Sequence, residues 1–164
     1  GSVLSTSETQ FVPTILGAKV SLLDELGVRP AVSFLGNISG PLFSDIETGT
    51  VVDFRFNFQH QLTDKMSFAY NLGGSVNTNI NDNAFVGLYT AIVGYSLTPK
   101  LSTFVEFYGF LPSGNTPNDH QIDFGLVYLV NANFQLDMFG GTGFSDVSPD
   151  TIFGFGLSVR IPKN

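Results

Sequence analysis

The sequence contains no cysteine and no tryptophan, and only 13% of its 164 residues are charged. Without cysteine the chain can form neither a disulfide scaffold nor a thiolate metal site. Seven basic against fourteen acidic residues give a net charge of -7, which disfavours nucleic-acid binding because that function needs a basic stripe. No continuous apolar run reaches the roughly 18 residues that a transmembrane helix requires.

Apolar residues nevertheless make up 43% of the chain, with 17 phenylalanines and 18 glycines. This content excludes a disordered chain, and the charged fraction is about half of that in an ordinary soluble domain. Few charges, many aromatics and no long apolar run are together typical of a transmembrane β-barrel. We therefore predict an all-β, antiparallel up-and-down transmembrane β-barrel of about 8–10 strands. It forms a single domain over residues 12–164, and residues 1–11 are interpreted as a tag scar and lead-in, since Gly1-Ser2 resembles a cloning remnant.

Alternation of apolar and polar residues runs through most of the chain. In residues 52–59, VDFRFNFQ, valine and three phenylalanines point one way and Asp53, Arg55, Asn57 and Gln59 the other. The pattern predicts nine strands, at residues 12–24, 28–38, 50–62, 66–77, 84–97, 101–111, 120–130, 134–144 and 151–161. Most exceed the five or six residues usual in soluble sheets and match the 9–11 or so needed to cross a membrane at a tilt.

The predicted connections alternate between short turns and longer loops. Short turns fall at 24–27, 63–65, 98–100 and 131–133, and longer loops near 39–49, 78–83, 112–119 and 145–150. This asymmetry is typical of outer-membrane barrels, whose periplasmic turns are short. A weak repeat, LTDKM at 62–66, LTPKL at 97–101 and LVNANF at 129–134, marks successive short turns.

Nine strands conflict with the even counts of bacterial single-chain barrels. Three explanations are open. Residues 3–11 contribute to a tenth strand, one of the nine is miscounted, or the chain is a fragment of a longer barrel.

Several segments carry a family resemblance. They are GYSLTPKLSTFVEFYGF at 94–110, QIDFGLVYL at 121–129, NFQLD at 133–137 and FGFGLSVR at 153–160, with GAKVSLL at 17–23 and GVRPAV at 27–32. Together they resemble the outer-membrane transporters of the meta-pathway phenol-degradation family, over roughly residues 12–161. Members of that family are longer, so the chain is similar to about their C-terminal two-thirds. The resemblance implies a role in the transport of aromatic compounds.

The alternation along each strand, in which every second residue points to the same face, places a set of polar residues on the face of the sheet opposite the apolar residues. Charges facing lipid near the midplane cost a few kcal/mol, so this set should turn inward. The predicted lumen or pathway residues are Lys19, Asp53, Arg55, Asn57, Gln59, Glu106, Tyr108, Asp123, Asp137 and Arg160. They form either a plug, in which carboxylates pair with Arg55, Arg160 and Lys19, or a polar pathway for a small solute. Phe104, Tyr108 and Phe139 are the candidates for apolar contact inside the lumen.

Other chemistry finds little support. The two histidines, His60 and His120, lack metal-ligand spacing and are interpreted as interfacial or surface residues. We expect no enzyme activity, no metal and no cofactor.

Three functions remain. The first is a passive channel for small hydrophobic or aromatic compounds in the outer membrane of a Gram-negative bacterium. Its partners would be the lipid bilayer and a small hydrophobic solute. The second is a non-transporting barrel that acts as a scaffold or a subunit of an envelope complex with other proteins. The third is a soluble barrel that binds an apolar ligand, which requires the aromatic face inward and Asp53, Arg55 and Asp123 outward.

Overall fold

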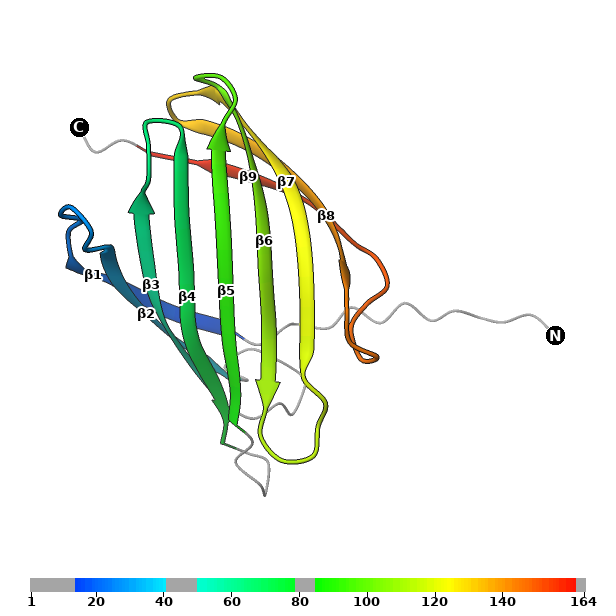
Figure 1. Cartoon of the computed structure of the whole chain (residues 1–164). Coiled ribbons are helices and arrows are strands. Elements are labelled where there is room, and N and C mark those ends of the chain that lie inside the picture. The colour runs from blue at the N-terminus through cyan, green and yellow to red at the C-terminus, as the bar shows by residue number, and fades with distance from the viewer. Residues whose placement is uncertain (1–13, 41–49, 79–84, 162–164) are drawn as a thin grey trace.

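The computed structural model describes residues 14–40, 50–78 and 85–161 and shows one antiparallel sheet of nine strands in sequence order (Figure 1). The strands are β1 (Thr14–Leu23), β2 (Ala31–Gly40), β3 (Val51–Gln61), β4 (Met66–Asn77), β5 (Phe85–Ser96), β6 (Leu101–Pro112), β7 (Asp119–Asn131), β8 (Phe134–Gly143) and β9 (Ile152–Val159). The sheet curls strongly, so that β1 and β9 both pass behind β4 and β5 in this view. Among these residues no helix is long and apolar enough to cross a membrane.

The predicted strands agree with the observed ones to within three residues at each described end. The largest difference is the start of β2, at Ala31 instead of residue 28. Leu26 and Arg29 form an isolated bridge with reciprocal backbone hydrogen bonds of 3.1 Å each. Gly27 between them has a φ of 61°, a conformation that favours glycine. The hairpin turn is therefore longer than alternation alone suggested.

The short turns lie at one end of the sheet and the described longer connections, 113–118 and 144–151, at the other, as predicted (Figure 1). The predicted loops near 39–49 and 78–83 lie mostly outside the described residues. The weak sequence repeat corresponds, in its first two copies, to a repeated turn structure in which a threonine side chain bonds to backbone nitrogens of the turn. In the β3–β4 turn the Thr63 hydroxyl accepts hydrogen bonds from the backbone nitrogens of Lys65 and Met66, at 3.3 and 3.0 Å. In the β5–β6 turn Thr98 does the same for Lys100 and Leu101, at 3.2 and 3.0 Å. Side-chain acceptance of turn amides explains why threonine recurs there.

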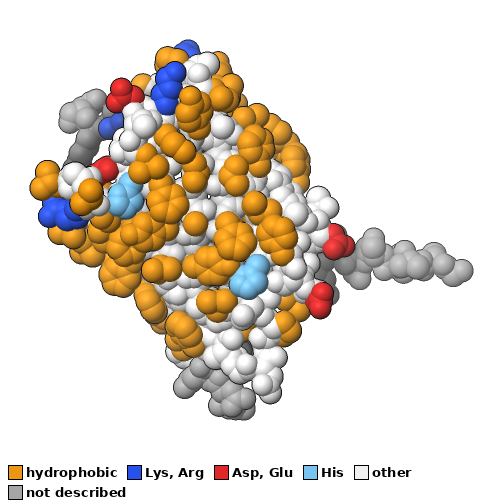
Figure 2. All heavy atoms as spheres, in the orientation of Figure 1, with side chains coloured by type: hydrophobic (Ala, Val, Ile, Leu, Met, Phe, Trp, Pro, Cys, Tyr) orange, Lys and Arg blue, Asp and Glu red, His pale blue; other side chains and the backbone are white. Residues whose placement is uncertain are grey.

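The two faces of the sheet differ in chemistry. Side chains on the convex face are mostly apolar and exposed, among them Phe54, Phe56, Phe124 and Phe155, the last 73% exposed. Hydrophobic side chains cover most of the face turned toward the viewer in Figure 2, with charged side chains at its margins. Within the described residues, the buried side chains larger than glycine are Leu88, Gln121 and Asp123. The part of the chain seen here thus has no conventional hydrophobic core.

Glycines on the concave face lie opposite its bulky side chains. Gly125 pairs with Phe104, and Gly154 with Phe139, on neighbouring strands. A Cβ atom added at Gly154 would meet the Phe139 ring at 2.5 Å, and one at Gly125 would overlap the Phe104 ring. Alternation of small and large inward residues is how narrow barrels fill their interior.

The strand count is nine within the described residues, so the miscount explanation is wrong for this part of the chain. β1 and β9 form the two edges of the sheet, and both are odd-numbered strands of an antiparallel meander, so they run in the same direction. The tenth strand proposed for residues 3–11 lies outside the described residues.

We expect the paired substitutions Thr63→Val and Thr98→Val to lower the free energy of unfolding by about 1 kcal/mol each, because turn amides lose their acceptors. Urea unfolding in detergent micelles, followed by circular dichroism, measures this loss. Thr63→Ser and Thr98→Ser keep the hydroxyl and serve as controls. Equal destabilisation by valine and serine would contradict the assigned role.

Candidate functional site

The predicted polar set lies on the concave face. Cross-strand partners share a face of the sheet, and the register joins the set across strands: Lys19 to Leu35 to Arg55, and Asn57 to Asn71 to Thr90 to Tyr108. The nine members that lie within strands are Lys19, Asp53, Arg55, Asn57, Gln59, Glu106, Tyr108, Asp123 and Asp137. Arg160 follows the end of β9, and its backbone nitrogen donates to the Asn133 carbonyl at 2.9 Å.

Part of this set converges on one cavity of about 240 Å³. Its charged lining is Arg55, Glu106 and Asp123, and its aromatic lining on the concave face is Tyr108, Phe110 and Phe139. Leu88, Tyr89, Thr90 and Gly109 complete the lining. Lys19, Asp53, Asn57, Gln59, Asp137 and Arg160 do not line it. The structure therefore separates a central cluster on β3 and β5–β8 from the rest of the polar set.

Charge compensation on this face is limited. In the described ranges one ion pair is present, between Arg55 Nε and Asp53 Oδ1 at 3.8 Å. Asn37 Nδ2 also donates to that Asp53 oxygen at 2.9 Å. The plug interpretation expected Lys19 and Arg160 to pair with carboxylates as well, and in residues 14–40, 50–78 and 85–161 neither does.

Glu106 and Asp123 are direct partners on β6 and β7, so two carboxylates stand side by side on the concave face. Asp123 is only 6% exposed, and its Oδ1 has no hydrogen-bond partner among the described residues. The Thr90 hydroxyl, which lines the same cavity as Glu106, accepts a hydrogen bond from Asn71 Nδ2 at 2.7 Å. A Cβ atom added at Gly141 would meet Asp123 Cβ at 2.6 Å, so this glycine makes room for the buried carboxylate.

A hydrogen-bonded relay, which the sequence reasoning missed, joins the cavity to the rim of longer loops. The Tyr108 hydroxyl donates to Gln121 Oε1 at 2.8 Å, and Gln121 Nε2 donates to Asp119 Oδ2 at 2.6 Å. Ser148, in the β8–β9 connection, donates its hydroxyl to Asp119 Oδ1. Gln121 shares the parity of Asp123, so alternation could have found it. The contact with Ser148 joins residues far apart in sequence and left no such signal.

Both histidines lie on the convex face. His60 stacks on Phe68 and Tyr70, with ring centroids 6.4 and 6.2 Å apart. His120 Nδ1 lies 2.7 Å from the Tyr89 hydroxyl. In the described part of the chain no group of three or more His, Cys, Asp or Glu residues could hold a metal ion.

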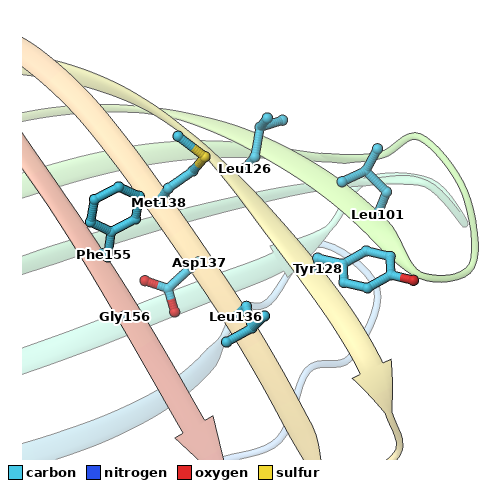
Figure 3. Close-up of a pocket in the computed structure, with 8 residues that line it drawn as sticks. All are labelled: Leu101, Leu126, Tyr128, Leu136, Asp137, Met138, Phe155 and Gly156. Carbon is cyan, nitrogen blue, oxygen red and sulfur yellow. The ribbon is translucent and has the colours of Figure 1, made fainter.

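A separate apolar groove of about 390 Å³ lies over β6–β9 near the short turns (Figure 3). Convex-face side chains supply most of its lining: Leu101, Leu126, Tyr128, Leu136, Met138 and Phe155. Asp137 and Gly156, which are cross-strand partners, complete it. An apolar groove with so little polar lining provides no chemistry for a reaction.

The sequence matches one family model, described as "Putative MetA-pathway of phenol degradation", over residues 1–161. The chain belongs to this family. The match includes residues 12–161, which carry the resemblance described above, and extends to residue 1. No curated protein matches the chain significantly.

The concave cluster can bind and orient a solute through two carboxylates, a guanidinium and three aromatic rings. Asp53, Arg55 and Asp123 lie on the concave side and the phenylalanines Phe54 and Phe56 on the convex side. The soluble ligand-binding barrel required the reverse arrangement, so the described sheet argues against that alternative.

We expect Gln121→Leu to destabilise the protein by about 1–3 kcal/mol, because Asp119 and Tyr108 lose a buried partner. Urea unfolding in micelles provides the measurement. Gln59→Leu, on the same face but exposed, is the matched control and should change stability by less than about 0.5 kcal/mol. Similar effects from both substitutions would show that the relay adds no stability.

Proposed function

We propose that this chain forms a transmembrane β-barrel of the bacterial outer membrane that passes small hydrophobic or aromatic compounds by diffusion. The observation that carries the proposal is the division of the sheet into an apolar convex face and a polar concave face. Membership of a phenol-degradation family supports aromatic compounds as the solute class.

The convex face requires an apolar environment. Its exposed side chains extend from Leu16 and Val20 on β1 to Phe153 and Leu157 on β9. Water-soluble proteins rarely expose an apolar surface of this extent. In a bilayer the same surface contacts lipid, and the ladder between neighbouring strands pairs the backbone groups that lipid cannot solvate. The groove in Figure 3 would then hold acyl chains.

In a closed barrel the outer edges of β1 and β9 must both be hydrogen-bonded, either to each other or to additional strands. Direct pairing would be parallel because both strands run the same way, whereas antiparallel closure needs an odd number of additional strands. An open edge is not tolerated in lipid. We propose closure by one further antiparallel strand, which gives the even count usual for bacterial barrels.

The concave cluster lines a passage with both apolar and charged side chains. Phe110, Phe139 and Leu88 offer apolar contact to a hydrophobic solute, while Glu106 and Arg55 keep the lining polar. Nothing in this passage requires a cofactor, a metal or catalysis, and we propose that the protein is not an enzyme.

A second candidate function is a scaffold or a subunit of an envelope complex. The two edge strands favour it, because their outer backbone groups could pair with strands of another chain. In that case the closing strand would come from a partner protein.

After refolding in detergent and insertion in a planar bilayer, we expect discrete conductance steps. Glu106→Gln should lower the preference for cations and Arg55→Gln should raise it, because each removes one charge from the lining. Reversal potentials under a salt gradient measure both shifts. Asp64→Asn, in a short turn, is the control and should leave selectivity unchanged. A folded, heat-modifiable barrel that never conducts would refute the channel and favour the scaffold.

The closing strand can be tested by cysteine pairs, since the chain has no native cysteine. Val20→Cys with Phe34→Cys, and Met138→Cys with Phe155→Cys, join known partners and should crosslink. Val20→Cys combined with a cysteine at Phe153, Phe155 or Leu157 should not. One intervening strand separates the edges by about 9.5 Å, beyond the roughly 7 Å that a disulfide can bridge. Efficient β1–β9 crosslinking in the monomer would mean direct parallel closure.

A further inference from the structure

We infer that the cavity at Glu106 and Asp123 is a binding site for the ammonium group of a small organic cation. The inference deepens the proposed function. It rests on that proposal in one respect only, which is that solutes can reach the concave face of the sheet. The binding itself does not require transport.

Uncompensated negative charge is the first argument. Glu106 and Asp123 are cross-strand partners, and like charges placed directly opposite each other destabilise a sheet. In the described ranges neither carboxylate pairs with a lysine or arginine. Arg55 lines the same cavity, but its ion pair is with Asp53, outside the cavity lining. A bound cation would relieve the repulsion.

The buried oxygen of Asp123 is the second argument. The residue is 94% removed from solvent, which follows from its exposure of 6%. Its Oδ1 lacks a partner within residues 14–40, 50–78 and 85–161, although Asp123 lines the cavity. Buried polar atoms are nearly always hydrogen-bonded, so this acceptor points to a donor that the described residues do not supply.

The lining selects the kind of cation. Calcium takes six to eight oxygen ligands, whereas this cavity offers two carboxylates and the hydroxyls of Tyr108 and Thr90 among apolar residues. Phe110, Phe139 and Tyr108 present aromatic surface, which attracts organic cations through the ring faces. An ammonium group donates hydrogen bonds to the carboxylates while its organic substituent contacts the rings. A volume of about 240 Å³ suits a molecule with one ring.

The test measures binding of benzylammonium to the refolded chain in detergent micelles by isothermal titration calorimetry. Benzyl alcohol, of similar size and without charge, corrects for partition into micelles. We expect saturable binding of benzylammonium and none of benzyl alcohol beyond partition. Glu106→Gln and Asp123→Asn should each weaken binding by about tenfold or more, because each removes a desolvated charge partner.

Two further variants separate a specific site from general charge. Asp64→Asn removes one negative charge in the β3–β4 turn and should leave the affinity for benzylammonium unchanged. Arg55→Gln removes the cavity's positive charge and should tighten binding several-fold. A merely structural role of Glu106 and Asp123 would not produce this increase. Each variant is checked for folding by circular dichroism and heat-modified gel mobility.

The outcomes are distinct. Equal binding by wild type, E106Q and D123N overturns the inference, as does calcium binding with no response to benzylammonium. If the protein binds benzylammonium at this site but never conducts in a bilayer, the channel proposal fails and the site stands. If it conducts but does not bind benzylammonium, the channel stands and the site fails.

Discussion

The pairing of backbone groups between neighbouring strands is the constraint on which the rest of this structure depends. With only three side chains larger than glycine buried in the described residues, packing of apolar side chains cannot supply the usual stabilisation. The ladder of hydrogen bonds instead fixes the pleat, and the pleat sends alternate side chains to opposite faces. Once Phe54 and Phe56 point outward, Asp53 and Arg55 must point inward. The polar cavity therefore follows from the same alternation as the apolar exterior.

Much of the fold could be predicted from the sequence because its period of two is nearly unbroken. Strand positions, the order of short and long connections and the threonine turns all depend on local signals within a few residues. The start of β2 was misplaced because Val28 and Arg29 continue the alternation while the Leu26–Arg29 bridge keeps them in the turn. The curl of the sheet and the state of its edges depend on how distant strands meet, which alternation does not encode.

The sequence could predict which face of the sheet each residue of the candidate site occupies, but not which of these residues lie next to each other. Parity assigned Arg55, Glu106, Tyr108 and Asp123 to one side, and the register then brought them to one cavity. Parity could not say that Glu106 lies directly opposite Asp123, because this depends on the pairing of β6 with β7. It also could not reveal that Lys19 and Arg160 form no ion pair within the described residues. The position of each residue along its strand, together with the register between strands, determines which residues on the concave face contact one another.

The glycines opposite bulky inward side chains have a consequence for how the sheet selects its pairing. A slip of one residue exchanges the two faces and is rejected by hydrophobicity, but a slip of two keeps every side chain on its own face. Such a slip would move Phe104 from Gly125 to Asp123 or Val127, where a side chain already occupies the space. Each glycine thus leaves space, through its missing side chain, for one large side chain of the neighbouring strand. Shape distinguishes registers that polarity alone would treat as equivalent.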